Sequence, residues 1–232
     1  LSILTPSLRR AKVFTQRTQC LARQRTIGQA LSGYAAGYRS IYPVHSLPDQ
    51  GWADAYSLRT DYPYSGKKNR YPLGLGLLVS TGQLPSSGLG EIVHCPSFNN
   101  LSSTVAPGHC MDVAHPWGYG GSGWGHEGYR IIGSYNYRGT SFGWVYKRPL
   151  HMGTVQADCV MLIDTPDLRM RGQESLYNAH GGYNRVFADG GGSFFDDPQY
   201  EVDAIALEIS GGTVDGRRGA SEVIFEYLSI AH

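Results

Sequence analysis

Apolar and polar positions in the first part of the chain repeat with the period of a long helix. Six positions fall on one helix face because they recur at steps of three or four residues. They are Cys20, Gln24, Ile27, Leu31, Tyr34 and Tyr38. Thr5 can cap the helix and Pro6 suits its first turn, whereas Pro43 forbids continuation. The pattern predicts one helix from residue 5 to about residue 38, with Cys20 facing the body of the protein.

The first half of this helix is too polar to be enclosed by a core. Between positions 8 and 20 the apolar residues are Ala11, Val13 and Phe14. A helix face without an apolar stripe has nothing to bury. We therefore expect the first half of the segment 1–40 to project from a globular body formed by residues 41–232.

The rest of the chain has short apolar stretches bounded by turn residues, as is typical of strands. The clearest hairpin joins Tyr183–Asp189 to Ser193–Asp196, with an Asp189-Gly190 step that supplies the positive φ of a tight turn. Further strands are predicted at 92–95, 131–137, 143–147 and 158–163, a short helix at 73–81, and a last apolar segment at 223–230. The stretch 200–210 fits either a helix or a strand. The expected fold class is α+β, a long N-terminal helix packed on an antiparallel β-sheet.

Charge divides the 232-residue chain into a basic start and an acidic remainder. Seven basic residues precede the first acidic residue, Asp49, whereas the other 13 basic residues face 19 acidic ones, a balance of about −6. A basic arm of this kind could bind nucleic acid or anionic lipid, or it could dock on the acidic body of another copy. No apolar run reaches the length of a membrane span.

The four cysteines form neither a Cys-x-x-Cys pair nor a haem-attachment motif. They are Cys20, Cys95, Cys110 and Cys159. Their even number is compatible with disulfides and an oxidising compartment, and four cysteines allow three pairings. The chain starts at Leu1 without an initiator Met, in a short apolar stretch, so we expect it to begin inside a longer precursor.

Metal binding and catalysis have weak sequence support. Two His-Cys pairs, with three further ligand-type residues near the second, could form a zinc site, although zinc ligands usually lie closer together. They are His94-Cys95 and His109-Cys110, with Asp112, His115 and His126. Loop histidines and disulfide cysteines explain the same residues. No zinc-protease helix or phosphate-binding loop is present, so we expect no enzyme activity.

A second polar set surrounds the predicted hairpin and could hold calcium through oxygen ligands. Its members are Asp164, Asn178, His180, Asn184 and Asp189. Local turns that hydrogen-bond to these side chains explain the set equally well, and we favour them. We therefore expect no cofactor, and we keep Asp164, His180 and Asp189 as the candidate metal ligands.

A glycine- and aromatic-rich loop at 107–129 suggests a binding surface. Four aromatic residues in or beside it could stack on sugar rings. They are Trp117, Tyr119, Trp124 and Tyr129. This gives an alternative function, a surface module that binds glycan or another polymer.

Several segments resemble one known family in the right order. Leu4-Thr5-Pro6-Ser7-Leu8-Arg9-Arg10-Ala11 resembles the stretch after the leader of pilin-like proteins, and Cys20 to Leu31 resembles their Cys-Leu-x-Asn-Leu-Arg-Gln-Ile-Gly-x-Ala-Leu. Leu73-Gly74-Leu75-Gly76-Leu77-Leu78, His94-Cys95-Pro96-Ser97 and Ser134-Tyr135-Asn136-Tyr137 follow. Asp164-Thr165 and then His180-Gly181-Gly182-Tyr183-Asn184-Arg185-Val186-Phe187-Ala188-Asp189-Gly190 resemble the closing hairpin. The family is the type II secretion pseudopilin G-like proteins with a prepilin-type leader, as in planctomycetes.

The chain also departs from that family pattern. Arg23 replaces an asparagine, Gly191 stands where many members carry histidine, and the loop at 115–128 has no counterpart. The membrane segment and glutamate that pilins use before assembly would lie upstream of Leu1.

The resemblance implies a pilin-like fold and a structural role. It implies an extracellular or cell-surface filament subunit that polymerises through its N-terminal helix, with no nucleic-acid partner and with membrane contact only through an upstream segment. The implied assembly residues are Leu4, Leu8, Arg9, Arg10, Lys12, Phe14 and Arg17. A glycan-binding module and a metal-binding protein or metalloenzyme remain the alternatives.

The resemblance also orders the disulfide alternatives. The family commonly carries cysteines at the positions of Cys20 and Cys95, which implies a Cys20–Cys95 pair. Cys110 and Cys159 would then form the second pair. The main rival is a Cys95–Cys110 pair, since those two residues are close in sequence.

Overall fold

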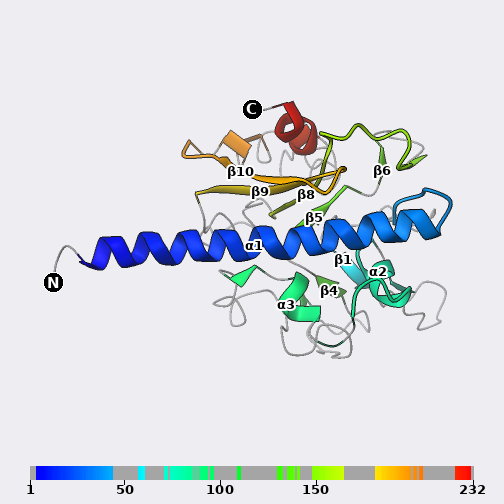
Figure 1. The fold of residues 1–232 in the computed structure, drawn as a ribbon, viewed down its shortest axis with the longest axis horizontal. Coiled ribbons are helices and arrows are strands. Elements are labelled where there is room, and N and C mark those ends of the chain that lie inside the picture. Colours follow the sequence, from blue (N-terminus) through cyan, green and yellow to red (C-terminus); the bar gives the residue numbers. More distant parts are fainter. Residues whose placement is uncertain are drawn as a thin grey trace.

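The computed structural model of the chain describes a long helix, two sheets and several short elements (Figure 1). The described residues are 4–43, 57–60, 71–72, 74–85, 87, 89–93, 95–96, 109–110, 130–132, 135–138, 140–141, 148–164, 181–199, 201–202, 204–205 and 223–230. The predicted strand at 143–147 and nearly all of the loop at 107–129 lie outside these residues.

Helix α1 spans Leu4–Gly37, close to the predicted bounds. Its predicted face is buried from Cys20 to Tyr34, with exposed fractions between 0% and 9%. Tyr38 differs, since it is 46% exposed and stacks on Tyr34 after the helix has ended. The backbone N–H of Ser40 donates to the carbonyl of Ala35, which closes the helix end.

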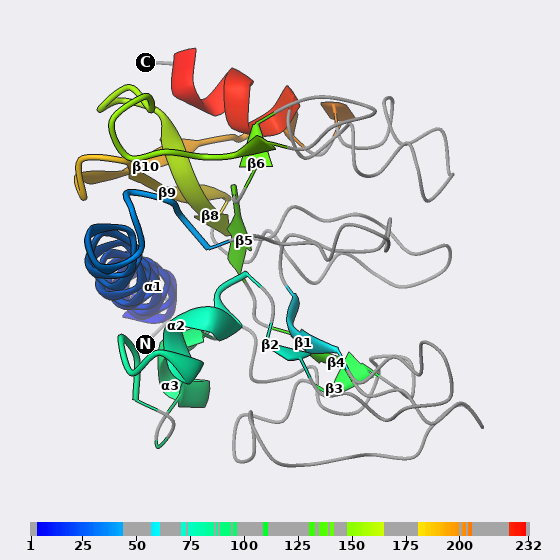
Figure 2. The ribbon, with the colours of Figure 1, turned by 90° about the vertical axis from the view of Figure 1, so that its right-hand side faces the viewer.

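The main sheet is antiparallel throughout, and α1 packs on one of its faces (Figure 2). Its strands in spatial order are β10 (Gly192–Asp196), β9 (Gly182–Phe187), β8 (Val160–Asp164) and β5 (Tyr135–Tyr137). Val186 lies in the core beneath α1, whereas Tyr183 lies in a second core on the opposite face. The alternation along β9 buries both faces of the strand.

A helix at 223–230 covers the opposite face of the main sheet (Figures 1 and 2). Ile224, Phe225 and Leu228 pack there against Tyr183. The buried guanidinium of Arg185 donates to the carbonyl of Leu228 and to the hydroxyl of Ser193. The sheet therefore has a helix on each face, which matches the predicted α+β class.

A second sheet and two short helices lie on the other side of α1 from the main sheet (Figure 2). The sheet order is β2 (Tyr71–Pro72), β1 (Ser57–Thr60), β4 (Arg130–Ile132) and β3 (His109–Cys110), with β3 parallel to β4. The helices are α2 (Gly76–Ser80) and α3 (Leu89–Val93). A separate pair joins β6 (Thr140–Ser141) to β7 (Arg148–Pro149).

Two strand predictions are wrong. Ile92 and Val93 belong to the end of α3, because Leu89 and Val93, four positions apart, are both buried on one helix face. The predicted strand at 131–137 is two strands, β4 and β5, which belong to different sheets.

Other local predictions are confirmed. The helix predicted at 73–81 appears as α2, the hairpin appears as β9 and β10, and Gly190 in its turn has a φ of 84°. The ambiguous stretch at 200–210 is helical at 201–202 and 204–205. There the Asp197 carboxylate accepts the backbone N–H groups of Glu201 and Val202, as a helix cap does.

Candidate functional site

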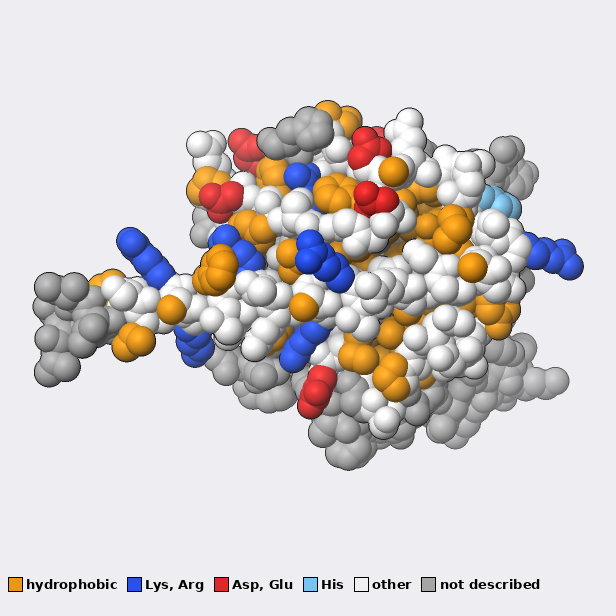
Figure 3. All heavy atoms as spheres, viewed as in Figure 1, with side chains coloured by type: hydrophobic (Ala, Val, Ile, Leu, Met, Phe, Trp, Pro, Cys, Tyr) orange, Lys and Arg blue, Asp and Glu red, His pale blue; other side chains and the backbone are white. Residues whose placement is uncertain are grey.

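The first half of α1 extends beyond the body of the protein (Figures 1 and 3). From residue 6 to residue 19 every position is exposed or half-buried, and the first fully buried side chain is Cys20. Leu8 is 68% exposed and Phe14 is 67% exposed. Two large apolar side chains on a narrow projecting helix present a surface that another molecule could cover.

The same segment is basic. Arg9, Arg10 and Lys12 are all exposed, and no acidic residue occurs between them and the body. The side chain of Leu4 lies outside the described residues. Of the other six predicted assembly residues, five have exposed side chains on the projecting part, and Arg17 is half-buried at its base. The five are Leu8, Arg9, Arg10, Lys12 and Phe14.

Arg17, near the end of the projecting part, and Arg25, beyond it, attach α1 to strand β10. The Arg17 guanidinium carbon lies 3.4 Å from the centre of the Phe194 ring, a cation–π contact. Arg25 Nη2 donates to the Gly192 carbonyl at 2.9 Å. Arg17 is therefore engaged by its own body.

Six exposed acidic side chains lie on the described part of the body. They are Glu91, Asp158, Asp189, Asp196, Glu201 and Glu226. On the face seen in Figure 3, basic side chains follow α1 and acidic ones lie on both sides of it. Opposite charges on one face suit contact between copies that are displaced along the helix axis.

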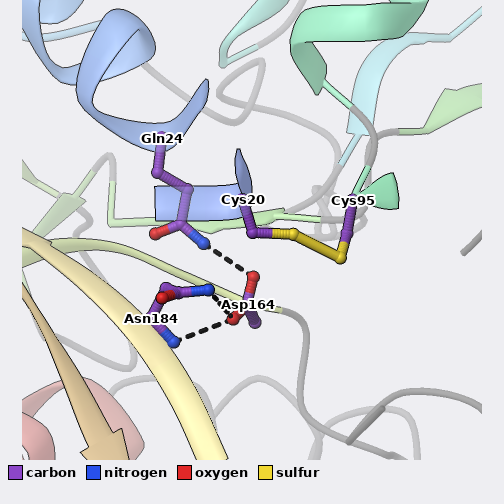
Figure 4. Close-up of a disulfide and its surroundings, with 5 residues drawn as sticks. All are labelled: Cys20, Gln24, Cys95, Asp164 and Asn184. Carbon is purple, nitrogen blue, oxygen red and sulfur yellow. Dashed lines mark hydrogen bonds between the residues drawn. A yellow bond between two sulfur atoms is a disulfide. The ribbon is translucent and has the colours of Figure 1, made fainter. Parts of the chain in front are cut away.

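The predicted Cys20–Cys95 disulfide is confirmed. Both residues are buried, and their Cα atoms are 5.3 Å apart, within the range that a disulfide requires. It joins α1 to the residues just after α3, where the projecting helix enters the body (Figure 4).

The predicted Cys110–Cys159 disulfide is wrong. Cys159 is a half-buried thiol whose Sγ accepts a hydrogen bond from Arg138 Nη1 at 3.2 Å. It immediately precedes β8 of the main sheet, whereas Cys110 belongs to β3 at the edge of the second sheet. The side chain of Cys110 lies outside the described residues.

A buried carboxylate lies beside the disulfide. Asp164 Oδ1 accepts from Gln24 Nε2 at 2.7 Å, and Oδ2 accepts from the backbone N–H and the Nδ2 of Asn184 at 2.8 and 2.9 Å (Figure 4). All three residues are at most 5% exposed. Burial raises the pKa of Asp164 to about 7, against the opposing effect of the hydrogen bonds from Asn184 and Gln24.

Two candidate calcium ligands in the described residues, Asp164 and Asp189, lie apart. Asp164 lies beside Asn184 near the start of β9, whereas Asp189 lies in the turn after its end and accepts the N–H of Gly191. His180 lies outside the described residues. The Asp189 contact is the local turn hydrogen bond that we favoured from the sequence.

The candidate zinc ligands give no metal centre among the described residues. His94 and the side chains of His109 and Cys110 lie outside them, as do Asp112, His115 and His126. Within the described part of the chain, the group with metal-like spacing is Cys20, Cys95 and Asp164. Its two sulfur atoms are joined to each other, and a metal needs thiolates.

The aromatic residues of the alternative binding surface are not described. They are Trp117, Tyr119, Trp124 and Tyr129.

Sequence reasoning missed the partnership of Gln24, Asp164 and Asn184. Gln24 lies 140 positions before Asp164, so no local pattern connects the two. One signal was available, because a glutamine inside an otherwise apolar stripe needs a buried polar partner.

Comparison with known proteins gives no relative. The chain matches no protein-family model, no curated protein and no solved structure. None of the helices in the described ranges has the length and apolar content needed to cross a bilayer. The family resemblance therefore stays a prediction.

Proposed function

We propose that this chain is a structural subunit of an extracellular pilus- or pseudopilus-like filament and that it polymerises through α1. The observation that carries the proposal is the half-helix at 6–19, which leaves the body with Leu8 and Phe14 about two-thirds exposed. Covering one such side chain contributes about 1–2 kcal/mol to association. A second copy of the chain supplies the cover.

Opposite charges indicate which surfaces of two copies would meet. Arg9, Arg10 and Lys12 carry three positive charges on the projecting helix, while the bodies expose acidic side chains beside α1. In a row of copies, the basic half-helix of one lies against the acidic side chains of the next. Such exposed charge pairs determine the relative position of neighbouring copies more than their affinity, and salt weakens them.

The disulfide agrees with this role. A buried Cys20–Cys95 bond is typical of proteins that work outside the reducing cytosol. We infer export to the cell surface as part of the proposal, with no enzyme activity and no resident cofactor.

Electron microscopy of the full-length gene product on its native cells tests the proposal. The variant Arg9→Glu, Arg10→Glu, Lys12→Glu should impair filament formation, because it replaces attraction between copies by repulsion. The matched control Arg9→Lys, Arg10→Lys, Lys12→Arg keeps the charge and should assemble normally. Normal filaments from the charge-reversed variant, or no filaments from the unaltered protein, contradict the proposal.

A further inference from the structure

Four of the five large apolar side chains that are exposed in the described residues form two pairs. Leu8 and Phe14 lie on the projecting half of α1, and Val223 and Ile230 lie on the helix at 223–230. The fifth is Tyr38. A single exposed apolar residue is ordinary on a protein surface, whereas two on one helix face suggest a contact with another molecule.

The first pair belongs to one face of α1, which we call the arm face. Leu8, Ala11 and Phe14 follow one another at steps of three residues, so they span a face about 120° wide. Arg10 and Lys12 lie one position on either side of Ala11, which places them at the two edges of that face, about 100° from its centre. All five residues are exposed. The arm face therefore has an apolar centre and a positive charge at each edge.

The second pair lies on the outer side of the helix at 223–230, which we call the receiving face. Val223 is 38% exposed and Ile230 is 76% exposed, and they lie about two turns apart along the same side of the helix. The opposite side packs on the main sheet. Glu226, 59% exposed, lies at one edge of the receiving face, and Tyr227 at the other edge donates to the Glu201 carboxylate at 2.6 Å. The receiving face therefore has an apolar centre and an acidic group at each edge.

We propose that the receiving face of one copy binds the arm face of the next copy. This inference rests on the proposed function, in which a second copy covers the projecting helix. Leu8 and Phe14 are about 9 Å apart along the helix axis. The corresponding spacing of the receiving pair is about 10.5 Å, so the two faces match in length. They also match in chemistry, since apolar side chains meet at the centre and opposite charges meet at the edges.

The positions of the two faces allow copies to be added in a row. Helix α1 packs on one face of the main sheet, and the helix at 223–230 packs on the other (Figure 2). The contact therefore joins two different surfaces that belong to opposite sides of the sheet. Such a contact can repeat from copy to copy, whereas a contact between identical surfaces stops at a dimer. A filament needs the first kind of contact.

Photo-crosslinking tests the contact without assuming which surface receives the projecting helix. The probe is benzoylphenylalanine in place of Phe14, because it keeps an aromatic side chain at that position. Copies labelled with nitrogen-15 and unlabelled copies are mixed at high concentration, and the crosslinked peptides are identified by mass spectrometry. We expect mixed-label crosslinks from position 14 to residues 223–230. Crosslinks that reach only other segments of the second copy, or no crosslink between copies, overturn the proposal.

Charge exchange between the two faces tests the contacts at their edges. Glu201→Lys with Glu226→Lys makes both edges of the receiving face positive. Arg10→Glu with Lys12→Glu makes both edges of the arm face negative. Each pair of changes should impair association, because like charges then meet, and the four changes together in one chain should restore it. A combined variant that associates no better than either pair contradicts the proposal.

Exposed acidic residues elsewhere supply the matched control. Asp158→Lys with Asp189→Lys makes the same change in net charge at two exposed positions outside the receiving face. This pair should not impair association, and it should not restore association to the arm variant. Equal rescue by both lysine pairs would mean that only net charge matters, and the proposal would fail. Glu226 lies 3.7 Å from Arg138 of its own chain, but losing an exposed pair changes stability little, which the thermal midpoint checks.

A change at the apolar centre completes the test. Ile230→Ser should raise the critical concentration for association about tenfold, because an apolar side chain no longer leaves water on contact. Tyr38→Ser, at the exposed apolar residue outside both faces, should leave that concentration nearly unchanged, and equal effects of the two changes overturn the proposal. If filaments form but the crosslinks miss residues 223–230, this inference fails and the proposed function stands. If copies crosslink through these residues without forming filaments, the proposed function fails and the contact stands.

Discussion

Removing the Cys20–Cys95 disulfide should be among the most destabilising changes in the described part of the chain. The bond closes a loop with a sequence separation of 75 residues, and both of its cysteines are buried. In the chain-entropy model, releasing a loop of that length returns about 4 kcal/mol of entropy to the unfolded state. Total stabilities of domains are about 5–15 kcal/mol, so this loss is a large fraction.

Urea unfolding of the double variant Cys20→Ala, Cys95→Ala, followed by circular dichroism, measures the effect. We expect the free energy of unfolding to fall by about 4 kcal/mol. The dependence on urea should steepen, because an unfolded chain without the crosslink exposes more surface. The unaltered protein in excess dithiol should behave like the variant, and the variant should not respond to dithiol.

The control Cys159→Ala removes a sulfur that is half-buried and in contact with Arg138. It should cost less than about 1.5 kcal/mol, the scale of one hydrogen bond. A loss below about 1 kcal/mol for the double variant would refute the reasoning, because the loop entropy alone exceeds that value. A double variant that still loses stability in dithiol would reveal a second disulfide and contradict the thiol assigned to Cys159.

Two glycines give further predictions, both measured by thermal unfolding. Gly28→Ala should lower stability by about 1–3 kcal/mol although alanine favours helices, because the new Cβ would lie 2.9 Å from Val186 Cγ1. The control Gly37→Ala, with open space around the new Cβ, should leave stability unchanged or raise it. Equal effects of the two changes would contradict the tight packing of α1 on β9. Gly190→Val should cost about 1–2 kcal/mol or more, because valine is strained at a φ of 84°; Gly190→Asn should cost less, and an unchanged midpoint for valine would place the turn elsewhere.

The elements that the sequence predicted well are those fixed by local repetition. The buried face of α1 follows from apolar spacing, and the β9–β10 hairpin follows from alternation around the Asp189-Gly190 step. The end of α1 at Gly37 also agrees with the glycines and Pro43 in that region.

The failures concern contacts between distant parts of the chain. Ile92 and Val93 favour a strand by side-chain type, but Val93 is buried one helical turn after Leu89. The pairing of Cys159 was inferred by elimination, which assumed that every cysteine forms a disulfide. The bonds of Asp164 to Gln24 depend on how α1 lies against β8, and spacing along the chain carries no information about that.

The position of the disulfide also has a mechanical consequence. A force that pulls on the projecting half of α1 reaches its covalent attachment to the body at Cys20, where the helix becomes enclosed. The covalent bond passes that load to the segment after α3 before the hydrogen bond between Gln24 and Asp164 is stretched. The tension is thus shared between two sides of the helix. The contacts between α1 and the main sheet carry less of it, because the disulfide carries the rest. In the reduced protein, the same pull would act directly on the contacts between α1 and the main sheet.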